Sequence, residues 1–290
     1  MERLTKNAIS ILGEKGKLWI NNLPNIIEIL VDHWKLSHLI PVNNMTYHYV
    51  AKAKRQNNQL VVLKIGFDQK VTLEERQALT FFDGNASVRL IDYHEQYNAL
   101  LLQQAIPGDT LKSFYPANVE FVMDCYADTV KRLHQKWVIP LGFRHIRDWL
   151  KAIDSFASDQ LPEHLLKNAI KLKNNLFSSM EKEILLHGDL HQDNLLKNGN
   201  TWLTIDPKGI IGELAFEVAA FDFIHASDLG DNLVIKKLFD YRVNRIAEKI
   251  NLNSQRIKDW VFVRLILSAV WLVEDKGNPG WAIKLAEILI

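Results

Sequence analysis

The stretch Leu-His-Gly-Asp-Leu-His-Gln-Asp-Asn at residues 186–194 decides how this 290-residue chain is interpreted, together with Ile-Asp-Pro-Lys-Gly at residues 205–209. The first stretch has the pattern H-G-D-x-x-x-x-N, and the second places another aspartate shortly after it. Either stretch alone is weak evidence. The two in this order and at this spacing indicate a pair of acidic loops that serve phosphoryl transfer.

Phosphoryl transfer asks a protein mainly for positioning and for neutralisation of charge. Asp189 is expected to orient the attacking hydroxyl and to accept its proton. Asn194 and Asp206 offer the hard oxygen ligands that Mg²⁺ prefers. His187 is expected to brace the loop by hydrogen bonds rather than to act as a base.

A lysine is also needed to hold nucleotide phosphates, and Lys64 is the candidate because it follows the apolar run Val-Val-Leu at residues 61–63. Glu75 is the preferred carboxylate partner, with Glu74 as the alternative. The competing interpretation is ordinary: a lysine at the end of a strand is usually solvated, and both glutamates could be exposed charges on a helix.

The order of the expected elements divides the chain into a β-rich part, residues 1–104, and a helical part, residues 105–290. Helices are expected over residues 2–36 and 73–82, throughout 118–180, and from 214 to the end, while strands are expected over 45–53, 60–65, 88–93 and 99–103. This pattern predicts an α+β protein.

Composition excludes several classes of function. The formal net charge is +1 with acidic and basic residues well mixed, so no basic stripe for nucleic acid is expected. The longest apolar segment, residues 260–273, is interrupted by Arg264 and is too short to span a bilayer. The expectation is a cytoplasmic protein with no membrane or nucleic-acid partner. The oligomeric state is not predicted.

These residues resemble the aminoglycoside phosphotransferase family, which has a bilobal protein-kinase-like fold. The residues 205–209 followed by Gly212 and Glu213 look like the streptomycin 6-phosphotransferase branch, also described as aminoglycoside/hydroxyurea resistance kinases. The resemblance covers nearly the whole chain. It implies an enzyme that uses ATP or GTP with Mg²⁺ and phosphorylates a hydroxyl of a small molecule, an aminoglycoside such as streptomycin.

The resemblance also implies roles for single residues. Asp189 would be the catalytic base, Asn194 and Asp206 the metal ligands, and Lys64 a phosphate ligand paired with Glu75. The adenine would meet the backbone at Gln103 C=O and Ala105 N–H.

One departure from the family pattern concerns the loop over the phosphates. Residues 41–46 contain no glycine, and Asn43 with Asn44 is expected to form a left-handed turn there instead. Gln103 and Gln104 stand where many relatives carry an acidic residue, which leaves the choice between ATP and GTP open.

The acceptor site is less legible. A cationic acceptor needs carboxylates, and the candidates are Asp228 and Asp231, and Glu274 with Asp275 beside Trp271. The competing interpretation is that these acids face solvent at helix ends. Glu217 is expected to secure the loop after Asp206 rather than to contact substrate.

Two other functions stay open. One is a kinase of another small alcohol, such as an amino alcohol or a sugar-like metabolite, whose pocket would need few carboxylates. The other is a pseudokinase that binds nucleotide without turnover. A protein kinase is disfavoured because no A-P-E segment follows Asp206.

Overall fold

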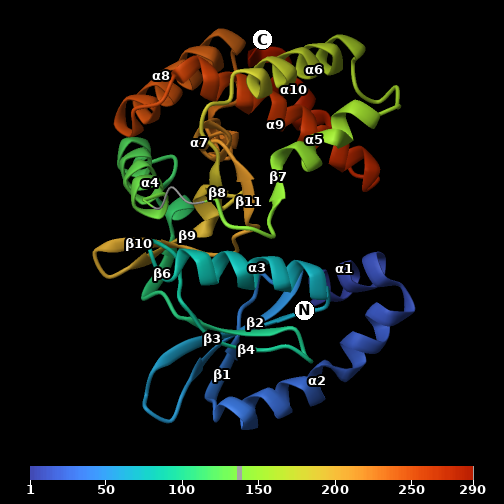
Figure 1. Ribbon diagram of the computed structural model, residues 1–290, viewed down its shortest axis with the longest axis vertical. Helices are drawn as coiled ribbons and strands as arrows, with labels where there is room; N and C mark the ends of the chain where they lie inside the picture. Colours follow the sequence, from blue (N-terminus) through green and yellow to red (C-terminus); the bar gives the residue numbers. More distant parts are fainter. Residues whose placement is uncertain (136–138, 290) are drawn as a thin grey trace. The chain divides into compact units, whose positions relative to one another are not determined.

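The computed structural model describes residues 1–135 and 139–289. The chain divides into two compact units (Figure 1). Unit 1 comprises Met1–Gly108 with Asn198–Leu203, and unit 2 comprises Asp109–Lys197 with Thr204–Ile290. No helix formed by the described residues is both long and apolar enough to cross a membrane.

Unit 1 is built on an antiparallel five-stranded sheet with the strand order β1-β2-β3-β5-β4. Its elements are α1 (Glu2–Leu12), α2 (Glu14–Trp34), β1 (Ser37–Pro41), β2 (His48–Lys54), β3 (Leu60–Gly66), α3 (Gln69–Phe82), β4 (Leu90–His94) and β5 (Ala99–Gln103). The β-rich character predicted for this part of the chain is confirmed.

Alternation along β3 decides which side chains meet which helix. Val61, Leu63 and Ile65 are fully buried and belong to one apolar cluster with the inner faces of α1 and α2. Because successive side chains of a strand point to opposite faces, Lys64 lies on the other face. There it meets Glu75 of α3.

Two predictions in unit 1 are corrected. The helix expected over residues 2–36 is two helices, which are separated at Gly13, where φ is +58°. The turn at Asn43 and Asn44 exists, but neither residue has a positive φ, so the expected left-handed conformation is absent there. The loop is fixed by Met45 instead, which is buried and whose sulfur accepts a hydrogen bond from Val50 N at 3.4 Å.

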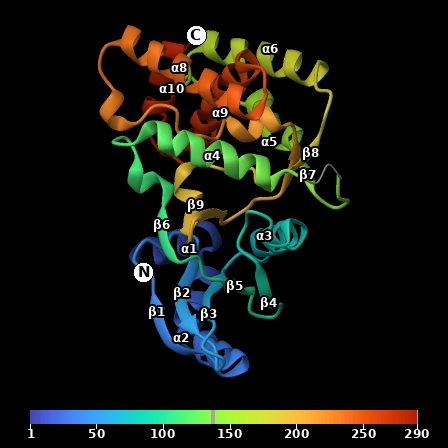
Figure 2. The same cartoon turned by 90° about the vertical axis from the view of Figure 1, so that its left-hand side faces the viewer.

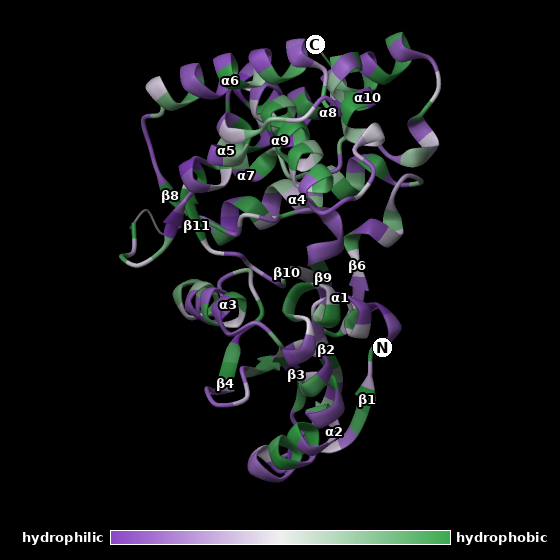
Figure 3. Ribbon diagram, turned by 90° about the vertical axis from the view of Figure 1, so that its right-hand side faces the viewer, coloured by the Kyte–Doolittle hydropathy of each residue, from purple (hydrophilic) through white to green (hydrophobic). Residues whose placement is uncertain are grey.

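Unit 2 is mainly helical, as predicted. Its helices are η1 (Leu111–Phe114), α4 (Val119–Leu133), α5 (Ile146–Ser155), α6 (Glu163–Ser178), η2 (Gln192–Asn194), α7 (Leu214–Val218), η3 (Ala226–Asp228), α8 (Asn232–Ile250), α9 (Ser254–Glu274) and α10 (Gly280–Leu289). The largely apolar α9 contacts α5, α6, α7, α8 and α10 (Figure 3). Helix α4 packs against α8 (Figure 2).

The prediction of helix throughout residues 118–180 is wrong. Helix α4 ends at Leu133, and residues 139–143 are not helical before the two-residue strand β7 (Arg144–His145). Residues 136–138 of the predicted helix lie outside the described residues. Pro140 and Gly142 lie in the intervening segment, where they disfavour helix, and Gly142 has a φ of +91°. Helices α5 and α6 are likewise separated by the segment 156–162.

Two small sheets complete the fold. One has the order β7-β11-β8, with β8 (Ile184–Leu186) and β11 (Ile210–Gly212). The other has the order β10-β9-β6, with β6 (Pro107–Thr110), β9 (Leu195–Asn198) and β10 (Thr201–Thr204). The second sheet includes the positions at which the chain passes from one unit to the other.

Candidate active site

The pairing of β8 with β11 brings the two acidic loops together within unit 2. The strands are antiparallel, and the last residue of β8 pairs with the first residue of β11, Leu186 with Ile210. The loop 187–194 leaves β8 at the same end of the pair at which the loop 205–209 enters β11. The two motifs, which β9 and β10 separate in the sequence, therefore become neighbours through the pairing of β8 with β11.

His187 ties the two loops to each other. Its Nε2 donates a hydrogen bond to Ile205 O at 2.7 Å, and its carbonyl accepts from Lys208 N at 2.7 Å. Its Nδ1 accepts from Asp189 N at 3.3 Å. Burial lowers the pKa of the His187 imidazole, which favours the neutral ring that these donor and acceptor roles require. The predicted bracing role fits this geometry.

Gly188 is required between His187 and Asp189. Its φ is +86°, and an added Cβ would lie 3.0 Å from Ile210 Cγ2 and 3.2 Å from Trp149 Cη2. Only a residue without a side chain adopts this conformation in this space without strain.

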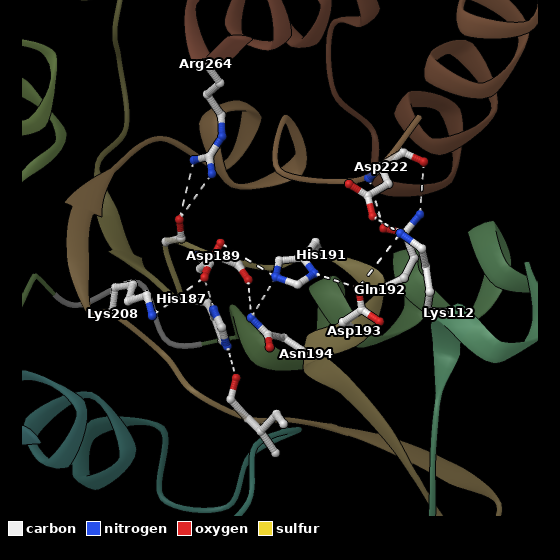
Figure 4. Close-up of polar contacts among 12 residues, drawn as sticks. Lys112, His187, Asp189, His191, Gln192, Asp193, Asn194, Lys208, Asp222 and Arg264 are labelled. Carbon is white, nitrogen blue, oxygen red and sulfur yellow. Dashed lines mark hydrogen bonds and ion pairs between the residues drawn. The ribbon is translucent and has the colours of Figure 1, made fainter. Parts of the chain in front are cut away.

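Asp189 is surrounded by positive charge (Figure 4). Its carboxylate lies 3.7 Å from Lys208 Nζ and 3.9 Å from His191 Nε2. Burial alone raises the pKa of the Asp189 carboxyl, but these basic groups together with Arg264 lower it, and the net pKa is below the ordinary value. The carboxylate is therefore ionised near neutral pH, as a hydrogen-bond acceptor for a hydroxyl must be.

Asn194 and Asp206 fit a divalent cation by their chemistry. The Asn194 amide donates from Nδ2 to Asp189 O at 2.8 Å, which commits its nitrogen to the protein and leaves its oxygen as the ligand atom. The backbones of the two loops are joined by Ile205 N donating to Asn194 O at 3.0 Å. Asp206 has a φ of +61°, a left-handed conformation uncommon for a residue with a side chain. Two hard oxygen donors from adjacent loops match the preference of Mg²⁺.

Glu217 of α7 anchors the loop that carries Asp189. Its fully buried carboxylate accepts hydrogen bonds from His187 N at 2.6 Å and from Gly188 N at 2.8 Å, and it meets His134 Nε2 at 3.1 Å. The prediction placed this role on the loop after Asp206. The structure corrects it, because the carboxylate reaches back along the chain to residues 187 and 188.

Within unit 1, Lys64 Nζ lies 2.7 Å from Glu75 Oε1, and both side chains are buried. Gln103 is the last residue of β5 and pairs with Val61 of β3, and Ala105 is buried just beyond it. Asn44 is exposed in the loop between β1 and β2. The nucleotide roles of these residues remain predictions.

Of the residues proposed for the acceptor, Asp228 and Asp231 lie in and after η3, whereas Trp271, Glu274 and Asp275 lie at the end of α9. Asp228 caps η3 and accepts hydrogen bonds from Arg242, with Nη2 at 3.1 Å from its Oδ1. The Asp228 side chain is only 11% exposed, so it does not face solvent, and because it pairs with Arg242 its charge is already neutralised. Glu274 ends α9, and Asp275 follows it, both exposed. Trp271 packs edge-on against Trp149 with a centroid distance of 5.8 Å.

A cavity of about 220 Å³ in unit 2 opens beside Asp189. Its polar lining comes from Asp189, His191, Asp222, Arg264 and Ser268, and its apolar lining is largely aromatic and aliphatic, including Trp281. Asp228, Asp231, Trp271, Glu274 and Asp275 are all absent from the lining of this cavity. Sequence reasoning missed Asp222 and Arg264, although each is a lone charge in an apolar run and that signal was available.

The charged groups of this wall are held by specific contacts (Figure 4). Asp222 exchanges two hydrogen bonds with the side chain of Gln192, at 2.9 and 3.0 Å, and its carboxylate pairs with Lys112. Arg264 donates to Gly188 O at 3.4 Å, and its guanidinium lies 4.6 Å from the centroid of the Phe216 ring. The Asp189 loop is thus flanked by both signs of charge.

The chain is similar in sequence and in structure to known kinases. Over 278 residues the chain is 26% identical to streptomycin 6-kinase of Streptomyces griseus, covering 91% of this chain and 87% of that protein. It is 27% identical to streptomycin 3''-kinase of Klebsiella pneumoniae, covering 76% and 83% respectively. The structure of aminoglycoside phosphotransferase APH(4)-Ia in complex with ADP and hygromycin B superposes with a TM-score of 0.67 at 13% identity, covering 90% of this chain and 96% of that one. This likeness confirms the predicted fold.

The model of one protein family, described as aminoglycoside/hydroxyurea antibiotic resistance kinase, matches residues 33–276. That range runs from the end of α2 to the end of α9 and includes all residues of the two acidic loops. The chain therefore belongs to the aminoglycoside/hydroxyurea antibiotic resistance kinase family.

Proposed function

We propose that this protein transfers the γ-phosphoryl group of ATP or GTP to a hydroxyl of an aminoglycoside, with streptomycin as the first acceptor to test. The observation that carries the proposal is the joining of the Asp189 loop to the Asp206 loop by β8, β11 and His187, directly beside a cavity. The kinship with streptomycin 6-kinase supports the class of acceptor.

In this proposal the hydroxyl of the acceptor donates a hydrogen bond to the Asp189 carboxylate. The carboxylate is ionised, because the surrounding basic groups lower its pKa. It orients the hydroxyl oxygen for attack on the γ-phosphorus and takes the proton as the new O–P bond forms. Glu217 and His187 hold the loop so that the carboxylate needs no rearrangement during the step.

Nucleotide binding is assigned to Lys64, whose ammonium is oriented by Glu75 at 2.7 Å, with Gln103 C=O and Ala105 N–H facing the adenine. Asn194 and Asp206 would hold Mg²⁺. When bound there, Mg²⁺ would supply positive charge to neutralise the charge that develops on the phosphate groups.

The cavity beside Asp189 supports a second candidate. Apart from Asp189 itself, Asp222 is the one carboxylate that the described residues contribute to the lining, and it already pairs with Lys112, while Arg264 adds a positive charge. An acceptor with few positive charges would fit this lining as well. A kinase of another small alcohol is therefore the second function to test.

The test measures nucleotide consumption and the mass of the acceptor for the wild-type protein and for Asp189→Asn, with Mg²⁺-ATP and Mg²⁺-GTP, and with and without streptomycin. We expect streptomycin to gain one phosphate group and kcat to fall at least about 10²-fold in the variant, while nucleotide affinity stays nearly intact. Asp128→Asn, an exposed change of the same kind on α4, is the matched control.

Each outcome of this test is informative. Turnover that survives Asp189→Asn would remove Asp189 from the role of the base. Nucleotide binding with no stimulation by streptomycin would move the acceptor to another small alcohol, which a screen of amino alcohols and sugars would then address. Nucleotide binding without turnover on any acceptor would support the pseudokinase alternative.

A further inference from the structure

Lys208 lies between the proposed metal ligand Asp206 and the start of β11. Its backbone is fixed, because Lys208 N donates to His187 O at 2.7 Å. Its ammonium approaches Asp189, with Nζ at 3.7 Å from Oδ2 (Figure 4). The Asp206 loop thus brings an ammonium group beside the Asp189 carboxylate.

The contact between Lys208 and Asp189 is loose. At 3.7 Å it is longer than a hydrogen bond, and the two side chains are 45% and 36% exposed. An exposed pair of this kind is weak and is readily exchanged for another partner. The flexible stem of lysine lets the ammonium move over several ångströms while the backbone stays in place.

Asp189 has a second source of positive charge that does not move in this way. Arg264 is committed to Gly188 O and to the face of the Phe216 ring. Asp189 is therefore compensated from the protein interior whether or not Lys208 stays beside it. The transferred phosphoryl group must arrive beside the Asp189 carboxylate, which is where the mobile Lys208 ammonium lies.

The acceptor oxygen that donates its proton to Asp189 is the same oxygen that bonds to the γ-phosphorus. The oxygens of the phosphoryl group consequently pass within reach of any cation that contacts Asp189. We propose that Lys208 is a catalytic residue: its ammonium leaves the Asp189 carboxylate and donates hydrogen bonds to the oxygens of the phosphoryl group during transfer. This inference rests on the proposed function.

The step balances without a change in the protonation of Lys208. The bond between the acceptor oxygen and the γ-phosphorus forms, and the bond from the γ-phosphorus to the bridging oxygen breaks. The electron pair of the broken bond leaves with the nucleoside diphosphate, and the acceptor proton passes to Asp189. Lys208 stays cationic and stabilises charge that is spread over the phosphoryl oxygens in the transition state.

The experiment compares Lys208→Met and Lys208→Arg with Lys171→Met, which makes the same change of charge at an exposed position of α6. We expect Lys208→Met to lower kcat by about 10²- to 10³-fold, with nucleotide affinity changed by less than about threefold. Lys208→Arg should recover part of the rate, because it keeps the charge. The control should behave as the wild-type protein does.

A second measurement keeps this test separate from the identity of the acceptor. Aluminium fluoride mimics the phosphoryl group in transfer, so it should tighten ADP binding in the presence of Mg²⁺ in the wild-type protein and lose that effect in Lys208→Met. Failure of streptomycin to be phosphorylated would count against the acceptor and leave this measurement readable. An unchanged kcat in Lys208→Met, or aluminium fluoride that tightens ADP equally in both proteins or in neither, would overturn the role of Lys208.

Discussion

Replacing Glu217 by glutamine tests whether the anchored loop is what makes Asp189 effective. The change keeps the shape of the side chain and removes its charge. In the present structure Oε1 accepts from His187 N and meets His134 Nε2, while Oε2 accepts from Gly188 N. The best placement of the glutamine keeps its oxygen at the first position. Its NH₂ group then faces Gly188 N–H, and two donors oppose each other.

The size of the effect follows from that geometry. A buried N–H that loses its acceptor costs about 1–3 kcal/mol, and the remaining hydrogen bond becomes weaker because it no longer has a charged acceptor. The neutral side chain regains part of this, since no charge is then buried. We expect the free energy of unfolding to fall by about 2–4 kcal/mol. We also expect kcat to fall, because the loop that carries Asp189 is no longer held in position.

Urea unfolding and steady-state kinetics measure the two effects, with Glu248→Gln, an exposed change on α8, as the control. The pH gives an independent check. Burial raises the pKa of the Glu217 carboxyl, but the hydrogen bond and charge of His134, together with His187 and the hydrogen bond from Gly188 N, lower it to below its ordinary value of 4.5. The stabilisation is therefore complete above pH 4.5 and is lost as the pH falls through the lowered pKa. Glu217→Gln should remove this part of the acid dependence. An unfolding free energy within about 0.5 kcal/mol of wild type together with an unchanged kcat would refute the anchoring role.

Two further predictions concern the metal and the acceptor. Asp206→Ala should abolish the Mg²⁺ dependence of nucleotide binding, because a hard oxygen ligand is lost; calorimetric titration with and without Mg²⁺ measures this, and retained dependence would contradict the assignment. Asp228→Asn should lower the free energy of unfolding by about 1–3 kcal/mol by weakening the pair with Arg242, and the KM for the acceptor should not change. A raised KM at unaltered stability would return Asp228 to the acceptor site.

What could be predicted from the sequence is what short-range chemistry determines. The apolar run at residues 60–65 predicts β3 and places Lys64 within it. The spacing of the two acidic motifs allows them to meet, because a short strand after the first motif (β9) can pair with a short strand before the second (β10). The helix boundaries near Gly13 and Pro140 were missed because apolar periodicity continues on both sides of each break.

The partners of the charged groups could not be predicted in the same way. Lys112 of η1 pairs with Asp222, 110 positions away in the sequence, and Arg242 of α8 pairs with Asp228 of η3. Sequence spacing identifies an acid but does not reveal which cation will neutralise it. This is why the sequence did not reveal that Asp228 pairs with Arg242.

The left-handed backbone of Asp206 has a consequence for how this protein can be altered. A residue with a side chain is held there at a cost in conformational energy, and glycine would adopt the same φ of +61° with less strain. Selection for thermal stability alone would therefore favour loss of this aspartate. Libraries screened only for heat resistance should accumulate glycine or asparagine at position 206 among their inactive members, and a screen that retains activity should leave the position untouched.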